Sequence, residues 1–324
     1  MTIGDHLQRF GGKRAFTFPD AEPGASKSRD ELPAADSVAW RIGVESYDAK
    51  ETWPECFARF AEAVDVTQVR ALIVGMWNDA YDNGPDEVIE TLVAAKDRLP
   101  ALRALFLGDI VMEECEISWI TQGLVTPLLD AFPALKVFGV RGGQNLDFPA
   151  VPHERLKKLI VQTGGMPAEV VRGIAASELP ALTHLDLWLG TSEYGGDSDV
   201  NDLAPILAGN RLPNLKHLAL RNSEIQDEIC TALAAAPVVA RLEVLDVSMG
   251  VLTDDGAAAL LTGQPLSHLK SLDMHHNYLT DAMRDRLREV LEPAEVRLDL
   301  DPDDAEEDDS DEDGTVWRFV SVGE

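Results

Sequence analysis

The sequence predicts an α/β solenoid: a curved horseshoe with a parallel sheet on its concave side and helices on its outer side. Three observations support this fold class, namely the length of 324 residues, a leucine frame that recurs along most of the chain, and helix signals between successive copies of that frame. A chain of this length is near the upper limit for one ordinary core, whereas stacked repeats bury their leucines against one another without such a limit. Hydrophobic residues at 45% and charged residues at 26% are ordinary values for a folded protein.

The leucine frame is clearest at residues 269–279. There Leu269, Leu272 and Asn277 fit the pattern LxxLxLxxNxL, with methionine counted as leucine-like, and degraded copies begin at Val69 and Val296. The remaining copies start at positions 21 to 33 residues apart: Leu102, Leu135, Leu156, Leu182, Leu215 and Leu242. A period of this size indicates stacked units that each supply one strand.

This pattern and period resemble the leucine-rich-repeat superfamily over residues 38–300. Helix signals between the strands are closer to its ribonuclease-inhibitor-like subtype. Thr253 is an expected N-cap, and Gly256 stands where the helix is expected to approach the sheet closely. Residues 109–119 and 187–191 are also similar to an uncharacterised family of bacterial cytoplasmic leucine-rich-repeat proteins, a resemblance that implies no activity. Apolar residues four apart support two more helices: Ile225, Ile229 and Leu233, then Leu279, Met283 and Leu287.

The turn after each strand departs from the pattern. The asparagine that normally bonds this turn is present only as Asn277. Glycine permits the tight backbone but supplies no side-chain hydrogen bond, so we expect other groups to satisfy these turns and the repeats to be irregular. The equivalent positions elsewhere hold Gly143, Gly164, Gly190, Ser223 and Gly250.

Five segments are predicted along the chain. Residues 1–37 form an N-terminal arm, because residues 17–37 are rich in proline and charge, and residues 38–68 form a cap with a strand at 38–44 and a helix at 52–64. The repeats cover residues 69–300. Residues 301–314 are predicted to be an acidic disordered loop, with ten acids between Asp301 and Asp313. Residues 315–324 form a C-terminal strand or cap over the last repeat, or else a free binding motif, which are two explanations for Trp317 and Phe319.

Charge and cysteine content limit the function classes. With 28 Lys+Arg against 57 Asp+Glu, the formal charge of −29 repels nucleic-acid phosphate and anionic lipid, and no local basic patch offsets it. The sequence thus predicts no nucleic-acid or membrane partner and favours a basic protein. Three cysteines without a CxxC pair, and the absence of a signal peptide or an 18-residue apolar stretch, predict a reduced cytoplasmic protein.

The predicted inner wall has two halves, because repeat positions 3, 5 and 7 face the concavity. In the N-terminal half these positions are too apolar for a solvated sheet, so we expect the preceding segment to cover them, or an apolar patch of a partner to bind there. They are Ala71, Ile73, Gly75, Ala104, Phe106, Gly108, Val137 and Gly139.

The C-terminal half is polar and aromatic and holds the candidate partner-binding residues. Trp188 is the expected aromatic anchor, while Arg221 and the aspartates orient the partner. A solvated face without a partner remains an alternative. Another is a metal site or a metal-dependent hydrolase built from His184, Asp186, His217, Asp246, Asp273 and His275, although no ligand spacing such as HExxH supports it. The complete candidate set is His184, Asp186, Trp188, His217, Arg221, Asn222, Asp246, Ser248, Asp273, His275 and His276.

Two longer loops suggest a second surface. Trp77 and Tyr81 begin one loop, and Trp188 and Tyr194 lie at equivalent places in the other, so both are expected on one rim. They either pack over the repeat edge or form aromatic recognition loops. Because GxxxxGK[ST], GxGxxG, GxSxG and a recognisable Cys/His dyad are all absent, we predict a non-catalytic protein-binding scaffold without a cofactor or metal. A structural regulator attached to an enzyme is a further alternative.

Overall fold

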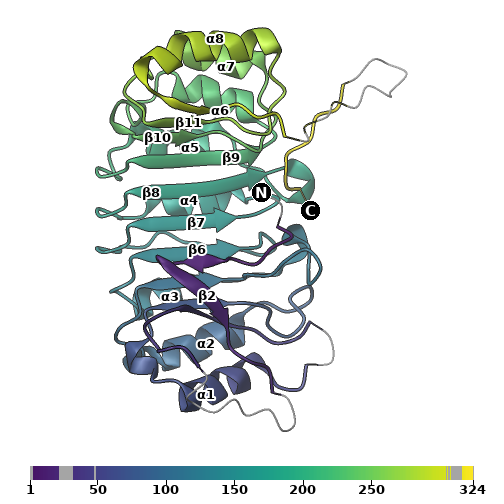
Figure 1. Cartoon of the computed structure of the whole chain (residues 1–324), viewed down its shortest axis with the longest axis vertical. Helices are drawn as coiled ribbons and strands as arrows, with labels where there is room; N and C mark the ends of the chain where they lie inside the picture. Colours follow the sequence, from purple (N-terminus) through teal and green to yellow (C-terminus); the bar gives the residue numbers. More distant parts are fainter. Residues whose placement is uncertain are drawn as a thin grey trace.

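The computed structural model describes residues 3–21, 32–46, 49–303, 305, 307 and 316–323. Within these ranges, twelve strands follow one another in chain order across a single open sheet, antiparallel between the first two and parallel from there on (Figure 1). The predicted α/β repeat fold is therefore confirmed. The strands are β1 (Arg9–Phe10), β2 (Lys13–Thr17), β3 (Ala39–Ile42), β4 (Ala71–Val74), β5 (Ala104–Leu107), β6 (Val137–Arg141), β7 (Lys158–Gln162), β8 (His184–Gly190), β9 (His217–Ser223), β10 (Val244–Asp246), β11 (Ser271–Asp273) and β12 (Arg297–Asp299).

The sheet register places equivalent leucines of successive repeats side by side. Leu185 pairs with Leu218, which pairs with Leu245, and the row continues through Leu272 to Leu298. The first four of these side chains are fully buried and belong to one hydrophobic core that runs from Phe18 to Leu300, with Leu298 packed against it. Each repeat thus covers the leucines of its neighbours, which is why no single repeat needs a core of its own.

The helices cover the opposite side of the sheet from the concave wall (Figure 1). Their ends follow the sequence: Thr52 caps the first through a capping box with Glu55, and Thr253 caps the seventh as predicted. Gly256 lies against Asp227 of the preceding helix, where a Cβ would collide, and its approach to the sheet stays a prediction. The helices are α1 (Trp53–Ala63), α2 (Asp86–Ala94), α3 (Pro127–Ala131), α4 (Ala168–Ala176), α5 (Val200–Ala208), α6 (Gln226–Leu233), α7 (Asp254–Thr262) and α8 (Asp281–Leu291).

The turns without asparagine find substitutes, as expected. Asn277 donates to Met274 O at 2.7 Å and accepts from Leu279 N, the bonds that its place in the pattern predicts. In the β9 repeat, where serine replaces asparagine, the buried Gln226 of α6 donates to Leu220 O at 2.9 Å. A helix side chain therefore satisfies the carbonyl that the strand turn leaves open.

The N-terminal segment joins the sheet ahead of the predicted cap. Residues 13–17 form β2 and pair in parallel with β3, so this part of the predicted arm is a strand. Phe16 and Phe18 stack edge-on against Trp40, which explains why the segment is fixed there. Residues 1–2 and 22–31 of the predicted arm, residues 304, 306 and 308–314 of the predicted acidic disordered loop, and residues 315 and 324 of the predicted C-terminal strand or cap lie outside the described residues. None of the described helices is long and apolar enough to cross a bilayer.

Candidate functional site

The inner wall of the C-terminal half consists of rows of side chains that cross the strands. One row contains Lys158, His184 and His217 on β7, β8 and β9. A second row runs over β8 to β12 as Asp186, Ala219, Asp246, Asp273 and Asp299. Neighbouring strands lie about 4.8 Å apart, so the side chains of one row lie next to one another on successive strands.

Arg221 on β9 ties the acidic row together. Its Nε and Nη2 donate to the two oxygens of Asp186 at 3.1 and 3.0 Å, and its Nη1 lies 3.4 Å from Asp246 Oδ2. The guanidinium carbon lies 5.1 Å from the ring centre of Trp188. Burial alone would lower the pKa of Arg221, but the two carboxylates raise it above its usual value. Burial raises the pKa of Asp246, although Arg221 opposes this. These charges are therefore already neutralised inside the wall.

His184 and His217 form a stacked pair with ring centres 3.7 Å apart. Burial and the nearby Lys158 lower the pKa of His184 to about 2. Burial also lowers the pKa of His217 to about 4, against the attraction of Asp186. Both rings are neutral near pH 7, so they act as packed aromatic groups and not as cationic contacts for a partner.

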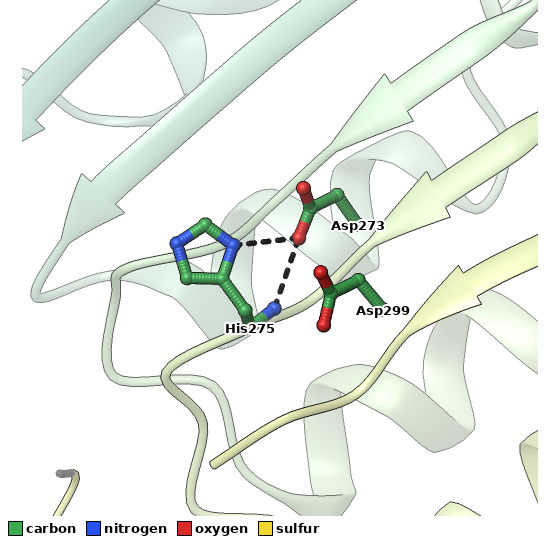
Figure 2. Close-up of side chains that lie close together, drawn as sticks. All are labelled: Asp273, His275 and Asp299. Atoms are coloured by element: carbon green, nitrogen blue, oxygen red, sulfur yellow. Dashed lines mark hydrogen bonds and ion pairs between the residues drawn. The ribbon is translucent and has the colours of Figure 1, made fainter. Parts of the chain in front are cut away.

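Among the described residues, Asp273, His275 and Asp299 form a group that could hold a cation, with one ligand atom from each within 4.8 Å of the others (Figure 2). His275 Nδ1 lies 2.7 Å from Asp273 Oδ1. This hydrogen bond raises the pKa of His275. Burial would raise the pKa of Asp273, but the bonds from His275 outweigh it and lower that pKa. A cation must therefore compete with an internal ion pair.

Three aromatic side chains from separate loops meet on the rim at the carboxyl ends of the strands. The ring centre of Trp119 lies 5.8 Å from the ring centre of Tyr81 and 6.4 Å from that of Tyr194. Tyr81 is 55% exposed and Trp119 39% exposed. Trp77, at the start of the first loop, is buried and donates to Asn83 O, so it shapes the loop from inside. The two predicted loops thus lie on one rim, and Trp119 connects them.

The N-terminal segment covers the apolar half of the inner wall, as expected. Phe10 of β1 packs on Ala71, Ile73 and Phe106, with a ring distance of 5.6 Å to Phe106. Gly11 approaches so closely that a Cβ there would lie 2.6 Å from the Cβ of Ala104. This surface is therefore occupied by the chain itself.

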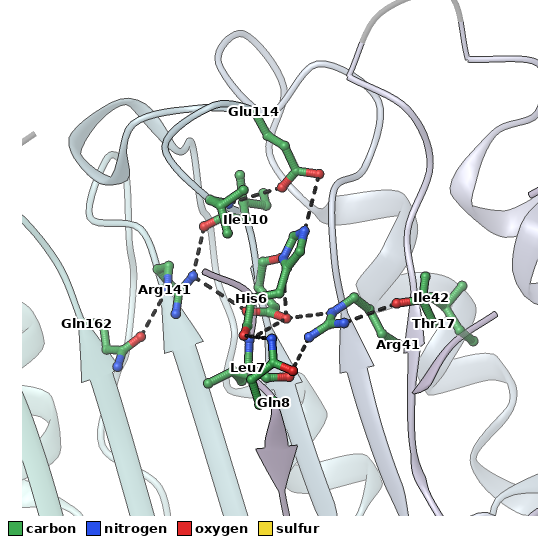
Figure 3. Close-up of polar contacts among 12 residues, drawn as sticks. His6, Leu7, Gln8, Thr17, Arg41, Ile42, Ile110, Glu114, Arg141 and Gln162 are labelled. Carbon is green, nitrogen blue, oxygen red and sulfur yellow. Dashed lines mark hydrogen bonds and ion pairs between the residues drawn. The ribbon is translucent and has the colours of Figure 1, made fainter. Parts of the chain in front are cut away.

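A buried ionic cluster fastens that segment. Asp109 is fully buried and accepts hydrogen bonds from Arg41 Nε at 2.7 Å and from Leu7 N at 3.1 Å. Arg141 Nη1 lies 3.5 Å from the same carboxylate, and His6 lies above it near Glu114 (Figure 3). Burial would raise the pKa of Asp109, but these partners outweigh it and lower the pKa. The cluster joins the N-terminal segment to the strands beneath it.

The C-terminal segment covers part of the polar half. Residues 316–323 descend along the carboxyl ends of the strands (Figure 1). Val322 joins Ile3, Ile117, Trp188 and Met249 in a small apolar cluster. Trp188 is consequently only 3% exposed.

Residues 211–234 and 242–261 match the model of the leucine-rich repeat family. A Bacteroides fragilis protein, whose crystal structure comes from a structural genomics consortium, is similar over 84% of this chain and 73% of its own, with 30% sequence identity and a TM-score of 0.73. The chain belongs to the leucine-rich-repeat family. No curated protein matches it. Leucine-rich-repeat solenoids provide extended surfaces for binding other proteins.

In this leucine-rich-repeat protein the predicted site residues divide by exposure. The C-terminal segment covers the ring of Trp188, so its predicted anchor role stays a prediction that requires this segment to leave. Others are half-buried and engaged with one another. The buried members of the predicted set are Asp186, Trp188, Asn222, Asp246, Ser248 and His276, and the half-buried ones are His184, His217, Arg221, Asp273 and His275.

Sequence reasoning missed Trp119, Asp109 and Asp299. Asp299 occupies the same inward position in the degraded last repeat as Asp246 and Asp273 do in theirs, so the frame itself pointed to it. Nothing local distinguishes Asp109 from the many other acids of the chain. Of the six residues in the alternative metal set, only Asp273 and His275 belong to the candidate cation group.

Proposed function

We propose that this leucine-rich-repeat protein is a non-catalytic scaffold that binds a basic protein partner through its aromatic rim. The observation that carries the proposal is the cluster of Tyr81, Trp119 and Tyr194, which gathers aromatic surface from three loops at one place. Large aromatic side chains are enriched among the residues that dominate binding energy at interfaces. The net charge of −29 favours a partner of opposite sign.

The inner wall, the other predicted binding surface, is less accessible to a partner than the aromatic rim. Its apolar half is covered by Phe10, and Arg221 already pairs with Asp186 and Asp246. A partner at the wall would first have to displace these contacts. The rim cluster needs no such change, because Tyr81 and Trp119 are exposed.

Changing Trp119→Ala together with Tyr81→Ala should weaken partner binding about tenfold or more, because it removes the exposed aromatic surface. The measurement is affinity capture from a lysate of the source cells, followed by titration of the purified partner. Val290→Ala is a matched control, since Val290 is 53% exposed on the outer helix α8. If the unchanged chain, the double variant and Val290→Ala bind the partner with equal affinity, the rim is not the binding surface.

Two finer assignments belong with this proposal. Helices that follow the strands on the outer side favour a ribonuclease-inhibitor-like arrangement within the family. A reduced, cytoplasmic setting is supported by three free cysteines, two of them buried. Burial raises the pKa of Cys56 to about 12, which keeps this thiol protonated and unreactive.

A divalent cation site at Asp273, His275 and Asp299 is a second candidate function, favoured by the clustering of their ligand atoms. It predicts one Zn²⁺ or Mn²⁺ per chain in calorimetric titration of protein purified without a histidine tag. Binding should be lost with His275→Ala and kept with His268→Ala, because His268 bonds to Val239 O on another part of the molecule. Loss in neither variant, or no binding at all, would exclude the candidate.

A further inference from the structure

Residues 319–323 are bound by groups from three successive repeats: two side chains and one main-chain carbonyl. His276 Nε2 bonds to Phe319 O at 3.0 Å, and Ser321 N donates to Met249 O at 2.8 Å. Asn222 makes a reciprocal pair with Val322: its Nδ2 donates to the carbonyl at 2.6 Å and its Oδ1 accepts from the amide at 2.9 Å. We call Asn222, Met249 and His276 the rim track.

The three residues of the rim track occupy the same position of three consecutive repeats, two residues after the third leucine-like position of the frame and directly before its asparagine position. Each has a positive φ, at 53°, 67° and 51° respectively, although none is glycine. Left-handed backbone is uncommon for residues other than glycine, most of all for Met249, and conformations of this kind concentrate at ligand clamps. The strain recurs at the 27-residue spacing of these repeats, which indicates a built feature of the rim.

The bound segment alternates like an extended ligand. Val320 and Val322 are buried, while Trp317 and Phe319 are more than half exposed. Val322 enters the apolar cluster with Trp188 and Ile117. Main-chain hydrogen bonds combined with inward side chains at alternate positions are the general mode by which proteins bind extended peptides.

The contacts also define the charge of a suitable ligand. Arg318 pairs with Glu307 at 2.7 Å and lies over the ring of Tyr278. The Tyr278 hydroxyl also donates a hydrogen bond to Phe319 O and accepts one from Phe319 N, each at 2.8 Å. Arg318 thus contacts one carboxylate of the connecting residues and one aromatic ring of the repeats, and the net charge of −29 also favours a basic ligand. Residues 300–315 connect β12 to the segment, a length that allows it to leave without disturbing the strand.

We infer that the rim track is a binding site for an extended basic peptide of a partner protein, with inward apolar residues two apart, and that the chain's own residues 318–323 occupy this site in cis. Asn222 selects the backbone at the second apolar residue, because its side-chain amide bonds both main-chain groups of Val322. The cluster around Trp188 is the pocket for that residue. A partner gains access by replacing the chain's own segment.

The test uses a fluorescent peptide with the sequence of residues 316–323 and the full-length chain. The variant Val320→Asp with Val322→Asp should release the internal segment and bind the peptide at least about tenfold more tightly than the unchanged chain, as measured by anisotropy. Adding Asn222→Gly should weaken this binding about tenfold, because glycine keeps the left-handed backbone and removes only the amide. Val316→Asp is the control, since Val316 is 41% exposed and should leave the segment in place.

Hydrogen exchange of the unchanged chain gives a readout that does not depend on any variant folding. The amides of Ser321 and Val322 should exchange much faster than those of β8 and β9, because the segment opens independently. Exchange at the rate of the sheet, or equal peptide binding by the released chain with and without Asn222→Gly, would overturn the inference. Dimerisation that Asn222→Gly abolishes would assign the site to a second copy of the chain and overturn the partner assignment. The peptide assay leaves Trp119 unchanged. A negative result would therefore count against the rim track and not against partner binding by the aromatic rim.

Discussion

Replacing Asp109 with Asn should lower the free energy of unfolding by about 3–5 kcal/mol, the range found when one partner of a buried ionic group is removed. Asp109 is fully buried between Arg41, 8% exposed, and Arg141, 4% exposed. Asparagine has nearly the same shape but leaves both guanidinium groups without a compensating charge. It also weakens the bond from Leu7 N that fixes the N-terminal segment.

The loss should be measured by urea unfolding at pH 7, with Asp97→Asn as the control because Asp97 is exposed. Hydrogen exchange should show the change first at residues 3–17, since Leu7, Arg41 and Asp109 form the connection between this segment and the sheet. A loss no larger than that of Asp97→Asn would mean that Phe10 and its apolar contacts, rather than the ionic cluster, hold the segment in place.

The repeat frame made the sheet predictable, because each leucine position is set by contacts with the equivalent residue one repeat away. Leu185, Leu218, Leu245 and Leu272 follow the frame and stack as expected. The alternation of side chains along each strand also gave the correct inward residues, including the row of Asp186, Asp246 and Asp273. The sequence therefore predicts the features that the repeat period sets, namely the stacked leucines and the inward-facing residues of each strand.

Contacts between distant segments have no such pattern. Asn222 and Val322 are 100 positions apart, and Arg41 and Asp109 are 68 apart. Neither pair has a spacing that marks it, so Trp188 was expected to be exposed and Asp109 was not distinguished. Only the apolar composition of the N-terminal half revealed that its wall needed a cover. The polar half has its own cover over Trp188, and its polar composition gave no comparable signal.

Changing Arg221→Met should cost about 3–5 kcal/mol of stability, because it leaves Asp186 and Asp246 buried without their cation. Arg172→Met is the matched control: Arg172 lies 2.9 Å from Asp202 but is 53% exposed at the side chain, so its loss should cost at most about 1 kcal/mol. Urea unfolding of both variants at pH 7 makes the comparison. Similar losses would show that Arg221 is an exposed contact after all, available to a partner as the sequence first suggested.

The pH dependence tests the cause of that loss. The pKa of Asp246 is already raised by burial, and Arg221 holds it down. Without Arg221 the folded pKa of this carboxyl rises further above its unfolded value, so the native state binds more protons than the unfolded state and stability increases as the pH falls. The deficit of Arg221→Met should thus be largest at pH 7 and shrink as the pH drops through the raised pKa.

Adding Asp186→Asn and Asp246→Asn to Arg221→Met should restore most of the stability at pH 7, because the two buried carboxylates that lost their cation are then removed. A deficit that is constant with pH and persists in the triple variant would place the role of Arg221 in its packing on Trp188 instead of its charge.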